Sequence, residues 1–239
     1  MTDHPSLPSP AALRAQLDAL RAERGYLLPH HGPLLAAAPD LHAAYRQMYA
    51  ALTLTQRHLD PFEKEFVWLV LLVALREEIG THHLDLFRRA GGSAEQAQLA
   101  CQLAGYAAAA EGFAFAAQHW RDWFPALDPA DGYLDGARRL IGAIVPEATA
   151  TLALLTAQAA AGRDWGVAAH LRAACRAGIA EEKLVEALAL LIWPAGVNRF
   201  VAACTVWRAL ILAGDLAPSP RFRAWAETEG QGALPPPAA

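Results

Sequence analysis

An internal repeat constrains the fold of this 239-residue chain more than any other feature. A shift that carries Arg76 onto Arg163, 87 residues further on, aligns two long stretches without a gap. The other paired positions include His83 with His170, Phe113 with Phe200, Trp120 with Trp207, and the Arg-Ala-Gly triplets that begin at Arg89 and Arg176. Alanine matches mean little in an alanine-rich chain, but matches of His, Gly, Phe and Trp indicate two related copies of one structural unit.

A weaker echo extends the repeat upstream. The Gly-Tyr-Leu triplet at Gly25 precedes Pro39 by the same interval as the triplet at Gly132 precedes Pro146. Between the proline and the paired histidine, the first copy is longer by 20 residues. We therefore predict a first copy with N-terminal helices over 1–127, a shorter second copy over 128–229 that lacks about one helix, and a disordered tail over 230–239.

The spacing of apolar residues predicts an all-α fold. Alanine and leucine dominate, β-branched runs are nearly absent, and the apolar positions recur with helical rather than alternating periodicity. Local signals place the ends of several helices. One helix is expected to end near Gly25, a second to run from Pro39 to about Leu54, and a third to start at Asp60-Pro61, since Asp is a good cap and Pro suits a first turn. The clearest interior break lies at 128–132.

Charge and hydropathy exclude several classes of partner. The net charge is −4, and without a Lys/Arg block neither nucleic acid nor an anionic membrane is expected as a partner. The longest apolar run, Phe66 to Leu75, is about half of what spans a bilayer, so we expect a buried helix. Three separated cysteines without a CxxC pair and a polar start without a secretory signal predict a soluble cytoplasmic protein.

Carboxylates and histidines gather around the apolar run in the first copy. If the helix continues, Glu78 and His82 stand four residues apart on one face, where a carboxylate can fix the imidazole tautomer and raise its basicity. Glu65, at the start of the apolar helix, is expected in a partly desolvated setting in which a carboxyl group keeps its proton. The alternative is a charged helix end in solvent with ordinary salt pairs.

The repeated histidines are the second candidate feature. His83 could act as a base or be retained for packing, whereas packing is favoured for His170, which has only Asp164 as a nearby acid. A metal site could be formed by Glu78, His82 and Asp85, but it would need a partner from another helix, for which His119 is the only suggestive residue. No HExxH spacing is present, so we expect no metal ion.

These residues resemble the AhpD/carboxymuconolactone decarboxylase family. In the first copy the resemblance rests on Leu59-Asp-Pro-Phe-Glu-Lys-Glu-Phe-Val, His83 and Arg89-Ala-Gly-Gly-Ser-Ala-Glu. In the second copy it rests on His170 and Arg176-Ala-Gly-Ile-Ala-Glu-Glu-Lys-Leu. It covers most of the chain, but the motifs are loose. The resemblance implies an AhpD-like helical bundle that assembles into homo-oligomers.

The chain departs from the family at the redox cysteines. Counted from His83, the two cysteine positions of the family fall at about Arg76 and Ile79, and neither residue can do thiol chemistry. A register shifted by one puts Glu78 and His82 in the Cys and His places instead, and both registers remain open. The family's peroxidases need the thiolate pair, whereas its decarboxylase branch works without it by acid–base chemistry.

The resemblance therefore favours a lyase of the decarboxylase type, in which decarboxylation or a related lyase or hydrolase reaction proceeds on a small carboxylated molecule. The expected catalytic residues are Glu65, His83, Glu78 and His82. Arg76 is expected to hold a substrate carboxylate, with His170 as a second substrate-binding residue, and no cofactor is expected.

Two alternatives stay open. The first is a non-catalytic helical binding or scaffold protein, in which Glu65 and Glu78 face water. The second is an alkylhydroperoxidase-like peroxidase that uses Cys101 or Cys175.

Overall fold

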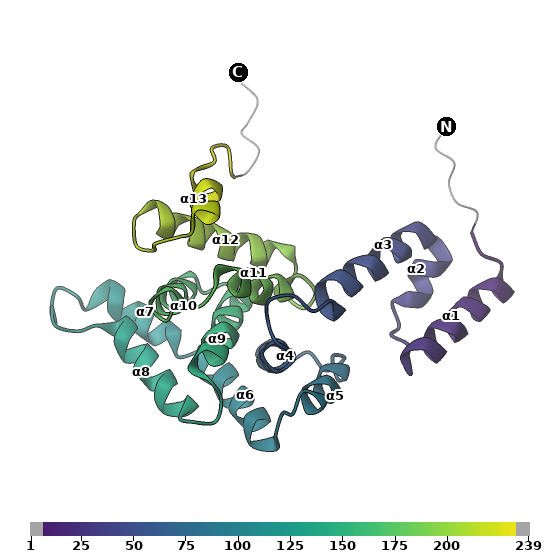
Figure 1. Ribbon diagram of the computed structural model, residues 1–239, viewed down its shortest axis with the longest axis horizontal. Coiled ribbons are helices and arrows are strands. Elements are labelled where there is room, and N and C mark those ends of the chain that lie inside the picture. The colour runs from purple at the N-terminus through teal and green to yellow at the C-terminus, as the bar shows by residue number, and fades with distance from the viewer. Residues whose placement is uncertain (1–6, 233–239) are drawn as a thin grey trace. The chain divides into compact units, whose positions relative to one another are not determined.

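The computed structural model describes residues 7–232, and every regular element in this range is a helix (Figure 1). The predicted all-α fold is confirmed. The chain forms two compact units, one ending at Thr55 and the other beginning at Gln56. The predicted disordered tail lies outside the described residues from position 233 onward.

The first unit contains three α-helices and a π-helical turn. These elements are α1 (Pro10–Arg24), α2 (His31–Ala37), α3 (Pro39–Tyr49) and η1 (Ala50–Leu54). Helix α1 ends as predicted, because Gly25 adopts a left-handed conformation with φ 80° that glycine takes without strain. The helix expected from Pro39 to Leu54 is present, although its last turn is π-helical.

Histidines occupy the interior of the first unit. His31 and His42 are buried, and Nδ1 of His31 lies 3.0 Å from Nε2 of His42. Arg24 lies 2.9 Å from Nε2 of His31. A guanidinium can only donate, so Nε2 of His31 accepts and its Nδ1–H donates to His42. Arg24 therefore fixes the tautomers of both buried rings.

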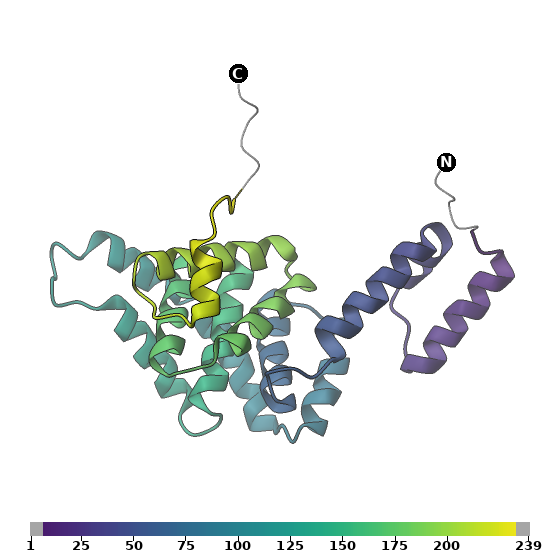
Figure 2. The same ribbon diagram turned by 45° about the horizontal axis from the view of Figure 1, so that its top comes forward.

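The second unit contains all the remaining elements. They are α4 (Pro61–Leu75), α5 (His82–Arg89), α6 (Ala94–Ala107), α7 (Ala110–His119), α8 (Pro129–Ile141), α9 (Glu147–Ala161), α10 (Asp164–Arg176), α11 (Glu181–Ala189), the 3₁₀ turn η2 (Leu190–Ile192), α12 (Val197–Leu212) and α13 (Pro220–Glu227). Helices α4 and α9 pack against each other and are buried along most of their length. Around them lie α5, α6, α10, α11 and α12, while α13 covers part of α12 (Figure 2).

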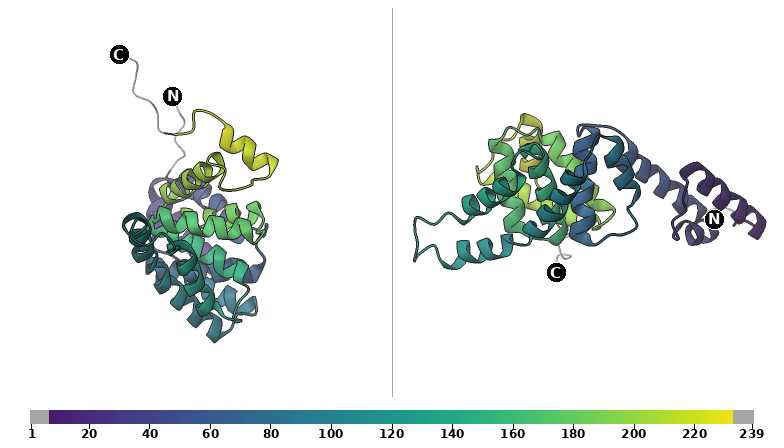
Figure 3. Two further views of the ribbon diagram at one scale, coloured as in Figure 1. Left: turned by 90° about the vertical axis from the view of Figure 1, so that its left-hand side faces the viewer. Right: turned by 90° about the horizontal axis from the view of Figure 1, so that it is seen from below.

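The segment between α7 and α8 projects from the rest of the second unit (Figure 3). It exposes large aromatic side chains, including Trp123 and Phe124. The break predicted at 128–132 is only partly correct. Asp128 caps α8 by accepting from the backbone N–H of Asp131, and the helix then runs on through Gly132.

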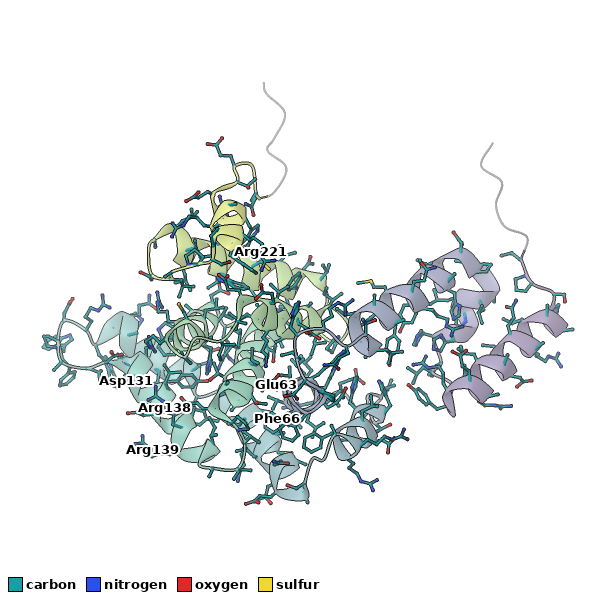
Figure 4. The ribbon with its side chains drawn as sticks, viewed as in Figure 1. Glu63, Phe66, Asp131, Arg138, Arg139 and Arg221 are labelled. Atoms are coloured by element: carbon teal, nitrogen blue, oxygen red, sulfur yellow. The ribbon has the colours of Figure 1, made fainter. Side chains whose placement is uncertain are left out.

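The start of α4 is anchored to α11. Asp60 and Glu63 form a reciprocal capping box around the first turn, which typically contributes about 1 kcal/mol. Both oxygens of Glu63 (labelled in Figure 4) accept from Lys183 of α11 at 2.6 Å. Glu186, one turn further along α11, accepts from the backbone N–H groups of His58 and Leu59 at 2.6 and 2.8 Å. These contacts fix the helix that carries the candidate site.

Element positions agree with the repeat only downstream of the central helices. Helices α6 and α11 begin at Ala94 and Glu181, an interval of 87 residues that equals the sequence shift. The central 15-residue helices α4 and α9 follow Asp60 and Pro146. Pro39 begins α3 in the first unit, so the upstream echo that paired Pro39 with Pro146 does not pair the two central helices. The duplication stays a prediction, and so does the division of the chain at 127/128. The boundary between the two compact units lies at 55/56.

Candidate active site

Glu65 and His83 form a buried pair between the two helices α4 and α5. Oε2 of Glu65 lies 2.7 Å from Nδ1 of His83, and 8% and 3% of their side chains are exposed. Glu65 belongs to the second turn of α4, and His83 is the second residue of α5, which packs against α4. The capped start of α4 and the tight packing of α5 thus hold the two groups at hydrogen-bond distance.

Burial sets the charge state of this pair. Burial raises the pKa of Glu65 to about 7, although the positive charges of Lys64 and His82 oppose the rise. Burial, with a smaller contribution from Lys64, lowers the pKa of His83 to about 3. Both shifts disfavour charge, so the pair exchanges a single proton near neutral pH.

That proton decides which nitrogen of His83 is basic. When Glu65 is protonated, its hydroxyl donates to Nδ1, and the neutral ring carries its hydrogen on Nε2. When Glu65 is ionised, it accepts from Nδ1–H, and Nε2 becomes a free base. The pair can therefore give or take a proton at Nε2 of His83 without leaving a positive charge on the buried ring.

Neighbouring side chains enclose the pair. The Trp68 ring stacks on His83 with ring centroids 4.1 Å apart, and His82 lies at the same distance. Lys64 is buried next to Glu65, and burial lowers its pKa against the opposing charges of Glu186 and Glu65. Sequence reasoning missed these neighbours. Trp68 and Lys64 are close to Glu65 in the sequence. Glu186 belongs to α11, and nothing in the sequence indicates that it lies near Lys64.

Glu78 is placed differently from the prediction. Helix α4 ends at Leu75, and Glu78 lies exposed in the connection to α5, so Glu78 and His82 do not share a helical face. The helix ends there because Arg76 takes a left-handed conformation with φ 56°. His82 begins α5 and is half-buried against the His83 ring. Of the two registers left open, the geometry pairs Glu65 with His83.

A cavity of about 440 Å³ lies between α4, α5 and α6, and the first two of these helices also carry the pair. Its lining brings together Arg76 and Glu78, which are two of the predicted site residues. Glu65 and His83 do not line it. It shares their helices, since Leu69 follows Glu65 by one turn of α4 and Leu84 follows His83 on α5.

His170 lies in a second buried polar cluster. Its Nε2 lies 3.3 Å from the hydroxyl of Tyr133, which accepts from Gln158 at 2.7 Å. Burial lowers the pKa of His170 to about 3, so the ring is neutral at pH 7. Its ring contacts no carboxylate among the described hydrogen bonds, in contrast to His83. The cluster agrees with packing, which the sequence favoured for this residue.

Residues 7–232 contain neither a metal-binding cluster nor a membrane-spanning helix. There, no three His, Cys, Asp or Glu side chains lie in an arrangement that could hold a metal ion. None of the described helices has both the length and the apolar character needed to cross a bilayer. Cys101, Cys175 and Cys204 are free thiols.

Fold and site together define an all-α protein with a buried carboxyl–imidazole pair. Residues 130–209, from α8 into α12, match the model of the carboxymuconolactone decarboxylase family. This match confirms the family resemblance for residues 130–209. Searches among curated proteins and among solved structures found no match.

The matched segment contains His170 and the cluster around Tyr133, whereas Glu65 and His83 lie outside it. The family assignment and the buried pair are therefore independent observations.

Proposed function

We propose that the protein is a carboxymuconolactone decarboxylase-like enzyme that acts on a small carboxylated molecule by acid–base chemistry without a redox step. The observation that carries this proposal is the 2.7 Å contact of Glu65 with His83, in a setting that raises the pKa of Glu65 to about 7. General acids and bases are most effective when their pKa lies near the operating pH. The family domain over 130–209 supports the reaction class.

The neutral pair suits the proton-delivery step of a decarboxylation. As CO₂ leaves, the electron pair of the broken C–C bond stays on the neighbouring carbon and spreads into an adjacent carbonyl group as an enolate. Nε2–H of His83 then protonates that carbon, while the proton of Glu65 moves to Nδ1. The pair ends with an ionised Glu65 and a neutral His83, and a proton from solvent restores it.

Single substitutions of the pair test this proposal. Glu65→Gln and His83→Gln keep the approximate size of each side chain but remove its proton transfer, so we expect kcat for decarboxylation of a lactone with a single carboxyl group to fall at least 100-fold. Glu95→Gln and His119→Gln, at exposed positions on α6 and α7, are matched controls. Unchanged turnover in both variants of the pair would show that this assignment is wrong.

The buried Glu65 also separates the proposal from the two alternatives. The scaffold alternative expects Glu65 and Glu78 to face water, and only Glu78 does. The peroxidase alternative needs Cys101 or Cys175, which are exposed on α6 and α10. Thiol labelling after peroxide treatment tests that alternative, because an unchanged number of free thiols excludes it.

A further inference from the structure

Arg76 ends α4 in a conformation that only glycine adopts without strain. Its φ of 56° is the only positive φ of a non-glycine residue in the described part of the chain. Two other helices end in the same left-handed conformation, α1 at Gly25 and α9 at Gly162, and both use glycine. At the end of α4 an arginine thus stands in a strained backbone conformation for which the other two helices use glycine.

Nothing within the described protein compensates for this strain through the side chain. The side chain of Arg76 is exposed, and its guanidinium makes no hydrogen bond or ion pair with any residue between 7 and 232. The adjacent Glu77 turns back and accepts from the backbone N–H of Ile79 at 2.8 Å. Strained residues persist where the surroundings or the function require them, so the guanidinium points to a ligand.

The cavity beside Arg76 shows what kind of ligand fits. Its walls are apolar and come from three helices: Leu69, Leu72 and Val73 of α4, Leu84 of α5, and Ala97 and Ala100 of α6. Polar groups gather at the end of α4 and in the connection to α5, where Arg76 is the only cation that lines the cavity. The volume of about 440 Å³ is within the range of small-molecule sites.

We propose that this cavity binds an amphipathic monocarboxylate, whose apolar ring or chain lies between α4, α5 and α6 while its carboxylate binds Arg76. A guanidinium recognises a carboxylate with two parallel hydrogen bonds. Glu77 and Glu78 both line the same mouth, so they repel a second anionic group and select against dicarboxylates. The inference rests on the proposed function, because it names the class of substrate that the enzyme would use. Binding to the cavity can nevertheless be measured without turnover.

The test compares two probes of the same shape, 2-naphthoate and its neutral amide. We expect the wild-type protein to bind 2-naphthoate at least tenfold more tightly than 2-naphthamide in calorimetric titrations. Arg76→Gly is expected to remove that tenfold preference and leave the amide affinity unchanged. Arg88→Gln, on α5 and outside the cavity lining, is the matched control and keeps the preference.

Stability provides an independent readout of the same variant. Because glycine relieves the strain at φ 56°, Arg76→Gly is expected to raise the melting temperature by roughly 2–4 °C while it loses naphthoate binding. Equal affinity for both probes, or naphthoate binding retained in Arg76→Gly, would overturn the proposal. A lower melting temperature together with weaker binding of both probes would also overturn it, since that result assigns Arg76 a structural role.

The proposed function can fail separately from this inference. Glu65→Gln leaves the cavity lining intact, so it is expected to bind 2-naphthoate like the wild-type protein. A loss of turnover without a loss of binding supports both proposals. If the wild-type protein binds 2-naphthoate but has no decarboxylase activity, the binding site is supported and the proposed function is not.

Discussion

Oε2 of Glu65 lies 2.7 Å from Nδ1 of His83, and the two side chains come from different helices that pack together. Because burial raises the pKa of Glu65 to about 7, the protonated, acid form of the pair disappears above neutral pH. We therefore expect kcat to fall about tenfold per pH unit above pH 7 to 8. A pH–rate profile from pH 5 to 9 checks this, and a flat profile contradicts the role of the pair as an acid.

The same pKa shift predicts how stability changes with pH. The folded protein holds the proton of Glu65 more tightly than the unfolded chain, whose carboxyl group titrates near 4.5. This contribution to the free energy of unfolding is fully present below pH 4.5 and is lost as the pH rises through 7. Between pH 4.5 and pH 7, the free energy of unfolding of the wild-type protein is therefore expected to fall by up to about 3 kcal/mol more than that of Glu65→Gln.

Urea unfolding at pH 5 and pH 8 measures this difference. Glu95→Gln, an exposed carboxyl group on α6, is the control and is expected to follow the wild-type profile. Parallel profiles for Glu65→Gln and the wild-type protein would mean that Glu65 titrates normally in the folded state.

The first unit is expected to loosen in acid. Burial, reinforced by His30 and Arg24, lowers the pKa of His31 to about 4. The unfolded chain binds a proton at this position near pH 6.5, so the stability that the neutral ring contributes is present above pH 6.5 and is lost as the pH falls through 4. Hydrogen exchange of peptides from α1 to α3, corrected for intrinsic rates, measures this loss.

His31→Leu separates this cause from general acid denaturation. It removes the buried titratable ring, so exchange protection of α1 to α3 is expected to become less dependent on pH between 4 and 6.5. His119→Gln, at an exposed position of the second unit, leaves the dependence unchanged. Equal pH dependence in wild type and His31→Leu contradicts the prediction.

Helix ends were predictable where the signal is local. Gly25 ends α1, and Asp60 with Pro61 starts α4, because a left-handed glycine and a side-chain cap act within one turn of the chain. The end of α4 carries no such signal, since Arg76 replaces the usual glycine. The helical pattern in the sequence therefore continues past Leu75, and the prediction that Glu78 and His82 share a helical face is wrong.

The candidate site was predictable only in part, for a similar reason. Glu65 stands out as an acid at the start of an apolar helix, and His83 as a repeated histidine. The buried contacts of Lys64 and Glu186 depend on how α11 packs against the start of α4, which a residue pattern within one helix does not encode.

Glu186 is expected to be a major stabilising residue of the second unit. Its Oε2 accepts from the backbone N–H groups of His58 and Leu59, and its side chain is buried. Hydrogen bonds to a charged acceptor contribute about 1.5–3 kcal/mol each, and removal of the acceptor leaves two backbone donors unpaired. We expect Glu186→Ala to lower the free energy of unfolding by about 2–4 kcal/mol.

Glu182→Gln, on the same helix, is the control. It removes only a surface ion pair with Arg221 and is expected to lower the free energy of unfolding by less than about 1 kcal/mol. Urea denaturation of both variants makes the comparison, and equal losses would mean that the carboxylate of Glu186 does not anchor α4.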